Sequence, residues 1–270
     1  DPPAVERPIS PGIPPILASC GGWQPCYEDG MRHALYFAPR DTALLARLGA
    51  RWLGRDAHDG KALQQPHVDR VDPEVFAAAT AAARRYGFHA TLKAPMRLAA
   101  GKTPAALLAA VRAFAAGQVP VTIPALEVAR VGSFLALVPT GPVPALDALA
   151  ERVVEAFDAF RAPPEESELA RRRHAGLTPR QEEYLVRYGY PHVMEEFRFH
   201  MTLTDAVDDG LAAALRPAAE AFFAPVLGRP VVVDALTVFV EPTPAAPFVV
   251  ADVAPLGVVV RAGHGAIGGS

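Results

Sequence analysis

One five-residue segment occurs twice in the chain, and this repeat constrains the fold more than any other feature. Phe-His-Ala-Thr-Leu occupies residues 88–92 and Phe-His-Met-Thr-Leu occupies residues 199–203, so four of the five positions are identical. In a chain of 270 residues with 8 His and 11 Thr, a His-x-Thr triplet is expected only about 0.3 times by chance. The shared Phe and Leu make coincidence rarer still, so the pair indicates an internal duplication.

The surroundings of the two copies repeat as well. From His89 to Val121 is 32 positions, and from His200 to Val231 is 31 positions. Apolar periodicity predicts the same order of elements around each copy. In the first half we expect a strand at about 33–38, a helix at 41–53, a short helix from Asp72, the motif strand at 88–92, a helix at 104–117 and a strand at 120–129. In the second half we expect a strand at about 133–138, a helix at 143–161, a charged helical insertion at 165–188, the motif strand at 197–203, a helix at 208–223, a strand at 230–240 and a last strand near 247–253.

Two copies of one β/α unit predict an α+β fold with two pseudosymmetric lobes. Each lobe should be an antiparallel-rich sheet with helices on its outer face, and the active-site cleft should lie between the lobes. We place the domain at residues 31–256, with repeat halves at about 31–130 and 131–256. Residues 1–30 hold seven Pro and are expected to be a disordered extension, and residues 257–270 are expected to be a flexible tail. Met31 is either the natural start of the protein or the residue after a Pro-rich linker or partner-binding tail.

The composition argues against several classes of function. The 26 basic and 29 acidic side chains give a net charge of −3, which disfavours a polybasic nucleic-acid coat or a binder of anionic membranes. Both cysteines, Cys20 and Cys26, precede the domain, so a disulfide framework or a thiolate metal site within it is excluded. No stretch reaches the ~18 apolar residues of a membrane span. We therefore expect a cytoplasmic protein that does not associate with membranes.

The spacing of each motif places its two polar side chains together. Side chains of a strand alternate between faces, so His89 and Thr91 share one face and His200 and Thr202 share another. A His and a Thr two residues apart stand ~6.6 Å apart along a strand, which leaves room for a phosphoryl group between them. Two such strands related by a two-fold axis would enclose one anion between two imidazoles.

The same alternation adds a cation to each strand. Lys93 is predicted to lie on the face of His89, and Arg198 and Thr204 on the face of His200. Lys93 and Arg198 are therefore candidates for binding the substrate together with the two threonines. Each of the two cations could instead be solvated or paired with a carboxylate.

Two histidines and two threonines around one anion suit the chemistry of phosphodiesters. Hydrolysis needs a base for the attacking oxygen and an acid for the leaving oxygen, and histidine, with a pKa of ~6.5, can fill both roles near neutrality. Threonine hydroxyls can donate to the non-bridging oxygens as charge develops. No His and carboxylate cluster occurs at metal-ligand spacing, so we expect neither a metal nor another cofactor.

At these residues the chain resembles the two-histidine phosphoesterase superfamily, which is defined by two His-x-Thr motifs in two pseudosymmetric lobes. It is most similar to a bacterial branch of unknown function whose genes commonly lie with those of phosphonate metabolism (carbon–phosphorus lyase). The similarity covers about residues 31–256. The segments that carry it are Arg85-Tyr-Gly-Phe-His-Ala-Thr-Leu-Lys-Ala-Pro95, Glu196-Phe-Arg-Phe-His-Met-Thr-Leu-Thr204, Ala34-Leu-Tyr-Phe-Ala-Pro39, Trp52-Leu-Gly-Arg-Asp56 and Leu169-Ala-Arg-Arg-Arg173.

The resemblance implies a metal-independent phosphodiesterase with His89 and His200 as catalytic residues and Thr91 and Thr202 as phosphate ligands. The favoured substrate is a small ribose or nucleotide cyclic phosphate linked to phosphonate metabolism. The alternatives are processing of an RNA end or of a 2′,3′-cyclic nucleotide, and binding of a phosphorylated metabolite without catalysis. RNA is not favoured because the domain is not basic. We expect a monomer, since the internal two-fold builds the site within one chain.

Five arginines and three tyrosines leave two interpretations open. The arginines lie on the charged insertion and form either a solvated face or a basic flap that recruits an anionic substrate. The tyrosines either stack on a base or sugar of the ligand or pack at the rim of the core. The residues concerned are Arg171, Arg172, Arg173, Arg180 and Arg187, and Tyr86, Tyr188 and Tyr190.

Overall fold

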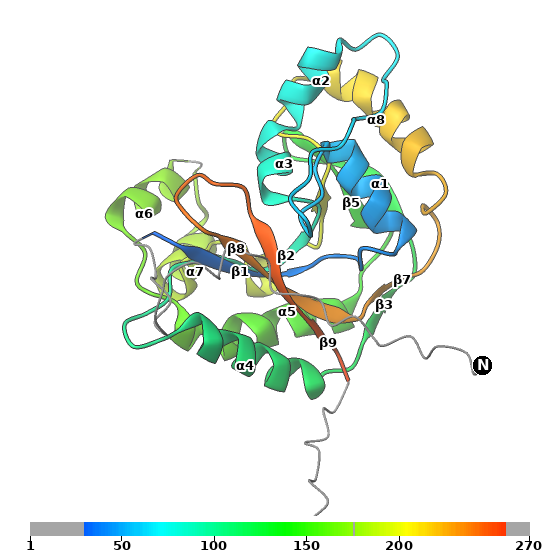
Figure 1. Ribbon diagram of the computed structural model, residues 1–270. Coiled ribbons are helices and arrows are strands. Elements are labelled where there is room, and N and C mark those ends of the chain that lie inside the picture. Colours follow the sequence, from blue (N-terminus) through cyan, green and yellow to red (C-terminus); the bar gives the residue numbers. More distant parts are fainter. Residues whose placement is uncertain (1–29, 175, 258–270) are drawn as a thin grey trace, which may run out of the picture.

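The structure, a computed structural model, describes residues 30–174 and 176–257 (Figure 1). The predicted extension and the predicted tail lie outside this part, apart from one residue of each. Among the described residues, no helix combines the length and the apolar character that crossing a bilayer requires.

Helices and strands alternate along the described chain, and the predicted α+β class is confirmed. The first half contains β1 (Arg32–Phe37), α1 (Leu44–Leu53), α2 (Pro73–Ala79), α3 (Ala81–Tyr86), β2 (Ala90–Met96), α4 (Pro104–Ala116), β3 (Val121–Ile123) and β4 (Leu126–Val131). The second half contains β5 (Phe134–Pro139), α5 (Pro144–Ala156), α6 (Glu166–Arg173), α7 (Pro179–Tyr188), β6 (Met201–Thr202), α8 (Asp209–Phe223), β7 (Val231–Val233), β8 (Ala235–Glu241) and β9 (Val249–Pro255). Two 3₁₀ turns lie at Asp158–Phe160 and Met194–Glu196.

The strands form one large antiparallel sheet and one small one. The large sheet has the order β4-β5-β6-β2-β1-β8-β9, and β3 pairs with β7 in the small sheet. Six strands of this sheet follow a symmetric order, β4-β5-β6-β2-β1-β8. When β1 is exchanged with β5, β2 with β6, and β4 with β8, the same order results, read from the other end. In this arrangement a late strand of each half pairs with the first strand of the other half, as β4 does with β5 and β8 with β1.

We expected a separate sheet in each lobe, and the structure instead has one continuous sheet. The two halves of the large sheet meet where β2 pairs with β6, at Ala90 and Met201. The motif strands are the innermost strands of both halves, so a two-fold relation between the halves places these strands next to each other. Backbone hydrogen bonding between them then joins the two sheets at their centre.

The second motif strand is shorter than predicted. The sequence predicts a strand at 197–203, whereas β6 covers only Met201–Thr202. In the preceding residues, backbone carbonyls are engaged by side chains and not by a neighbouring strand. The carbonyl of Phe197 accepts from Arg198 Nη1 at 2.6 Å, and the carbonyl of Arg198 accepts from His200 Nδ1 at 2.7 Å.

Several helices begin where their sequences predict. The side chain of Thr103 accepts from the backbone of Ala106, and Pro104 occupies the first turn of α4. Asp208 accepts from the backbone of Leu211 and so caps α8. These caps fix the N-terminal ends of α4 and α8. The two helices follow the motif strands β2 and β6 in corresponding positions of the two halves.

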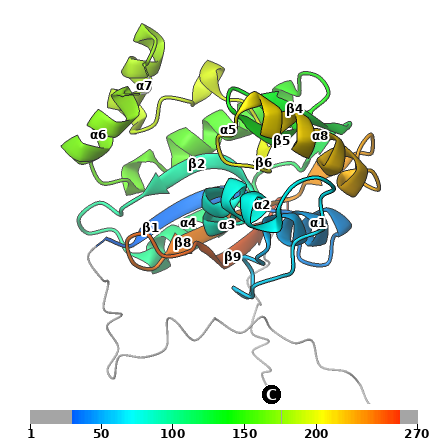
Figure 2. The same cartoon turned by 90° about the horizontal axis from the view of Figure 1, so that it is seen from above.

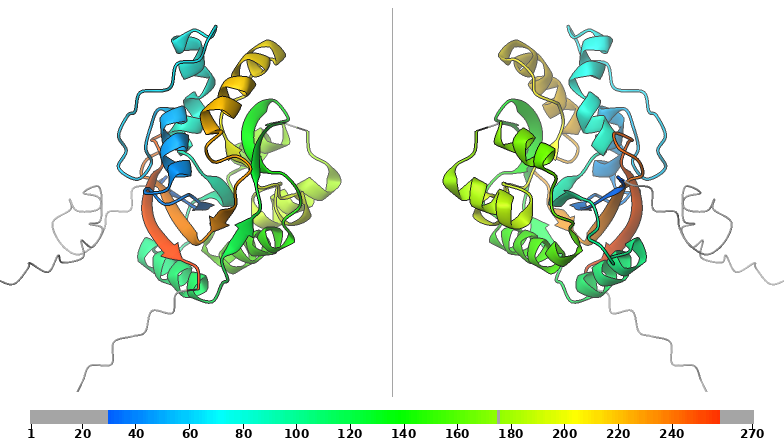
Figure 3. Two further views of the ribbon diagram at one scale, coloured as in Figure 1. Left: turned by 90° about the vertical axis from the view of Figure 1, so that its right-hand side faces the viewer. Right: turned by 90° about the vertical axis from the view of Figure 1, so that its left-hand side faces the viewer.

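The main apolar core lies between one face of the large sheet and four helices, and two smaller apolar clusters lie apart from it. The main core includes Trp52 of α1, Leu107 of α4, Val153 of α5 and Phe223 of α8, all of them buried. Figure 1 and Figure 3 show α1, α2 and α8 in the upper part of the view and α4 in the lower part, while Figure 2 shows α6 and α7 at the end of the molecule away from α1. Trp52 Nε1 donates to the carbonyl of Leu203 at 2.9 Å, which ties α1 to the end of the second motif. The opposite face of the sheet therefore remains for the motif side chains.

Gly49 of α1 is expected to be essential because it packs on Phe88, the residue before His89. A Cβ atom at Gly49 would overlap the ring of Phe88. An alanine in a helix interior normally stabilises by about 1 kcal/mol relative to glycine. Here the overlap should reverse the sign, so Gly49→Ala should lower the free energy of unfolding by roughly 1–3 kcal/mol. Urea denaturation measures this.

The matched control is Gly141→Ala, because a Cβ at Gly141 meets nothing within 4 Å. We expect the control to unfold at the same urea concentration as the parent or slightly above it. Equal stability of the Gly49→Ala variant and the parent would contradict the packing described for α1.

Candidate functional site

Four polar side chains of the two motifs meet on the face of the sheet opposite the helices. Ala90 pairs with Met201, and both are completely buried on the core side. Continuing this antiparallel register by one residue in each direction puts Thr91 opposite His200 and His89 opposite Thr202. Directly opposite side chains in such a pair have Cβ atoms ~4.5–5.5 Å apart. All four side chains are half-buried, and we call them the His–Thr tetrad.

The two histidines are oriented in the same way. His89 Nδ1 lies 2.9 Å from the carbonyl of Gly87, and His200 Nδ1 lies 2.7 Å from the carbonyl of Arg198. In both cases the partner is the carbonyl two residues earlier in the chain. Because a carbonyl only accepts, this pattern assigns the proton to Nδ1 and makes Nε2 of each ring a hydrogen-bond acceptor.

His89 lies against aromatic side chains. The ring of Tyr36 stacks on it with centroids 3.8 Å apart and an interplanar angle of 20°, and Phe239 is 6.0 Å away. Burial lowers the pKa of His89 to about 4, against the hydrogen bond to Gly87, and the nearby His200 lowers it further. At neutral pH His89 is therefore uncharged, and its Nε2 accepts a proton or a hydrogen bond. The hydroxyl of Thr91 is 3.2 Å from this nitrogen.

Lys93 does not share the face of His89, although strict alternation predicts that it should. A β-bulge between β1 and β2 makes Tyr36 pair with Thr91 and the adjacent Leu35 pair with Lys93. The extra residue moves Lys93 to the face of Leu35, where its Nζ donates to the carbonyl of Val154 at 3.0 Å. Burial lowers its pKa to about 8, against the raising effect of Asp158. This amine is part of the packing of α5 on the sheet.

The side chain of Arg198 does not belong to the tetrad. Its guanidinium is exposed and donates to the carbonyls of Glu195 and Phe197. The contribution of Arg198 is its own carbonyl, which orients His200. Thr204, expected on the same face, is fully buried and its hydroxyl accepts from the backbone of Leu135.

Sequence reasoning missed Tyr36, the fully buried ring stacked on His89. The signal was present, because Tyr36 belongs to a segment that resembles the family and lies in the strand next to the motif strand. Of the three tyrosines named in the sequence analysis, Tyr86 has its ring 6.3 Å from that of His89. Tyr86 also stacks on Phe248 at 4.9 Å, so it forms part of the wall behind the tetrad.

The arginines of the charged insertion differ in their surroundings. Arg173 pairs with Glu182 and Arg180 pairs with Glu183, and both side chains are exposed. Arg187 lies over the ring of Tyr188 at 4.9 Å. Arg172 is the exception, since its side chain is only 17% exposed and its guanidinium lies 4.7 Å from the ring centre of Tyr190. Most of this group is therefore a solvated, ion-paired surface.

This chain is similar to one protein family and to two curated proteins. The family described as "Protein of unknown function (DUF1045)" matches residues 91–249. A protein of Janthinobacterium sp. (strain Marseille) named ribose 1,5-bisphosphate phosphokinase PhnN is 45% identical over 226 residues, which are 82% of this chain and 50% of that protein. A protein of Laribacter hongkongensis (strain HLHK9) with the same name is 36% identical over 224 residues, 81% of this chain and 50% of that protein. The chain thus spans about half the length of the curated relatives it matches.

These findings confirm one prediction and overturn another. The expected branch of unknown function is confirmed by the family match. The predicted activity, a metal-independent phosphodiesterase that hydrolyses phosphoric diesters, is contradicted because the relatives are named as phosphokinases, which are transferases. The error has a physical reason: imidazoles and hydroxyls around an anion serve phosphate recognition in many reactions, and their arrangement does not specify which bond breaks.

The depressed pKa of His89 predicts a pH-dependent stability. The unfolded chain binds a proton on this residue below pH ~6.5, whereas the folded protein binds it only near pH 4. The stability that neutral His89 contributes is therefore present above pH 6.5 and lost as the pH falls toward 4, at up to about 1.4 kcal/mol per pH unit. His89→Gln should reduce the slope of this dependence in urea denaturation between pH 7 and 4.5, while His33, whose pKa burial also lowers to about 4, keeps its own contribution.

His67→Gln is the matched control, because the side chain of His67 is 76% exposed. The control should retain the pH dependence of the parent. Nuclear magnetic resonance of the histidine rings tests the same point directly, and a His89 signal that titrates near pH 6.5 would contradict the burial assigned to it.

Proposed function

The chain belongs to the DUF1045 family, and from this premise we propose that its His–Thr tetrad binds a phosphorylated ribose for a phosphoryl-transfer reaction. The observation that carries the proposal is the pairing of Ala90 with Met201, which brings both His-x-Thr motifs to one place. The names of the curated relatives supply the class of ligand, since both are named for a ribose bisphosphate.

The tetrad offers complementary groups for a phosphate monoester. Thr91 and Thr202 contribute hydroxyl donors, and His89 and His200 direct Nε2 toward the ligand while Nδ1 is held by a backbone carbonyl. A phosphate dianion favours the protonated form of a neighbouring imidazole. Binding should therefore draw a proton onto His89, which is uncharged in the free protein, and convert its Nε2 into a charge-assisted donor.

We assign the tetrad to the sugar phosphate, not to a nucleoside triphosphate. The phosphate-binding loop of many kinases has the pattern Gly-x-x-x-x-Gly-Lys-Ser/Thr, and this pattern occurs nowhere in the 270 residues. The nearest string, Gly101-Lys102-Thr103, has Met96 in the place of the first glycine. Lys102 lies 5.0 Å from the ring centre of Phe160, on the residues that follow α5.

The proposal includes two features expected from the sequence. One is a role in phosphonate metabolism, in keeping with the branch that the chain resembles. The other is kinship with the two-histidine superfamily in the arrangement of motifs and lobes, supported by the symmetric strand order around β2 and β6. Neither feature includes hydrolysis of a diester.

Calorimetric titration of the chain with ribose 5-phosphate tests the proposal. We expect binding to the parent, and binding weakened roughly 10- to 100-fold by His200→Gln, since a hydrogen bond to a charged group contributes ~1.5–3 kcal/mol. Thr202→Val should weaken binding about tenfold. Proton uptake, measured as a dependence of the binding enthalpy on the buffer, should accompany binding.

His67→Gln and Thr122→Val are the matched controls, since both residues are exposed and lie outside the tetrad. They should leave the affinity unchanged. An affinity for ribose 5-phosphate that survives His200→Gln and Thr202→Val would show that the sugar phosphate binds elsewhere and would overturn the proposal.

A further inference from the structure

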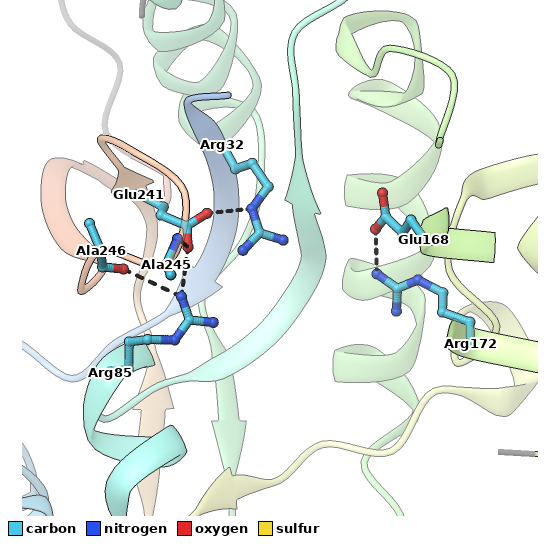
Figure 4. Close-up of polar contacts among 7 residues, drawn as sticks. All are labelled: Arg32, Arg85, Glu168, Arg172, Glu241, Ala245 and Ala246. Carbon is cyan, nitrogen blue, oxygen red and sulfur yellow. Dashed lines mark hydrogen bonds and ion pairs between the residues drawn. The ribbon is translucent and has the colours of Figure 1, made fainter. Parts of the chain in front are cut away.

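A second group of charged side chains lies beside the tetrad. It contains Arg32 of β1, Arg85 of α3 and Arg172 of α6, which are far apart in the sequence, and it contains the carboxylates of Glu168 and Glu241. Figure 4 shows Arg32 and Arg85 on either side of Glu241, and Arg172 beside Glu168 on the other side of β2 in that view. Three guanidinium groups against two carboxylates leave one net positive charge.

Arg172 has an incomplete set of partners. Its Nη2 donates to Glu168 at 2.9 Å, whereas its Nε atom is buried and has no hydrogen-bond partner among the described residues. A guanidinium group carries five N–H donors, and a buried donor without a partner destabilises the folded state. Such an atom is uncommon in folded proteins and shows that the contacts of Arg172 within the described residues do not use all of its donors. The exposed Arg173 on the same helix has both Nε and Nη2 bound to Glu182.

Arg32 and Arg85 are fixed in place by one buried carboxylate. Glu241 is completely buried, accepts from Arg32 Nε and from Arg85 Nη1, and also accepts from the backbone of Ala245. Arg32 also interacts with the hydroxyl of Tyr86, which adds to the effect of Glu241 in raising the pKa of this guanidinium, and Nε and Nη2 of Arg85 form no hydrogen bond within the described part of the chain. Both arginines are therefore held rigidly while some of their donors stay available, which is how a site for an anion is preorganised.

Aromatic rings connect Arg85 to His89 of the tetrad, and Arg172 to His192 near it. Arg85 lies 4.5 Å from the ring centre of Tyr86, whose ring is 6.3 Å from that of His89. On the other side, Arg172 lies over Tyr190, which is 5.6 Å from the ring of His192. Burial raises the pKa of Tyr190, and Arg172 opposes this effect. Burial lowers the pKa of His192, Glu196 opposes the lowering, and Arg172 and His200 add smaller lowering effects.

We propose that Arg172, together with Arg32 and Arg85, forms a second phosphate subsite next to the His–Thr tetrad. The ligand is then a pentose with two separated phosphate groups, one bound by the tetrad and the other by the three arginines. This inference rests on the proposed function, because it takes the tetrad as the first phosphate site. Guanidinium groups suit the second phosphate, since their planar N–H groups match its oxygens in pairs.

The structure supports a ligand with two phosphates better than one with an aromatic base. Tyr86 stacks on Phe248, and Arg85 lies over the Tyr86 ring. Tyr190 is covered by Arg172. These rings already have partners, whereas some of the guanidinium donors around them, such as Arg172 Nε, do not. What the group lacks is an acceptor.

The test compares two probes by calorimetric titration. The parent should bind ribose 1,5-bisphosphate at least tenfold more tightly than ribose 5-phosphate. Arg172→Gln should reduce this preference below threefold and leave the affinity for ribose 5-phosphate within threefold of the parent. Arg172→Lys, which keeps the charge but loses Nε, should also lose most of the preference. Melting temperatures should show that both variants fold.

Arg171→Gln is the matched control, because it removes the same charge from the neighbouring exposed position of α6. It should retain the tenfold preference. Equal affinity of the parent for the two probes, or equal loss of the preference in Arg171→Gln and Arg172→Gln, would overturn the second subsite and leave the proposed function standing. Failure of the parent to bind either probe would overturn both.

Discussion

The contact on which the rest of the molecule depends is the pairing of β2 with β6, centred on Ala90 and Met201. This pairing joins the two halves of the large sheet into one and puts both motifs in register. It buries Ala90 and Met201 against the helices and turns His89, Thr91, His200 and Thr202 to the other face. A slip of one residue would send these side chains into the apolar core. The fold and the candidate site therefore rest on the same hydrogen bonds.

Around this contact, polar groups are held by the backbone and by buried charges. The carbonyls of Gly87 and Arg198 orient the two imidazoles without using another side chain. Glu241 is completely buried and holds Arg32 of β1 and Arg85 of α3 in place. Removing one partner of such a buried pair usually destabilises a protein more than the pair itself stabilises it. These charged groups therefore contribute more to holding the side chains in fixed positions than to the free energy of folding.

Local sequence signals predicted the elements well where capping and apolar periodicity agreed, as in α4 with Thr103 and Pro104 and α8 with Asp208. They failed where side chains compete for the backbone or where the alternation of a strand is interrupted. The strand expected at 197–203 is reduced to β6 because carbonyls before it bind side chains. Lys93 changes face because of a β-bulge, which strict alternation does not anticipate. The activity predicted from the motifs was also wrong, since the same groups serve several reactions of phosphate.

The sequence by itself determined the α+β class, the repeat and the four residues of the tetrad, because these follow from local periodicity and from identity between two segments. Only the tertiary structure decided that the two halves share one sheet, that Tyr36 stacks on His89, and that Arg172 differs from its neighbours on α6. These features arise from contacts between residues distant in the chain. The residue pattern of one segment does not show which distant side chain will bury a given residue. It also does not show which hydrogen-bond donor will remain without a partner.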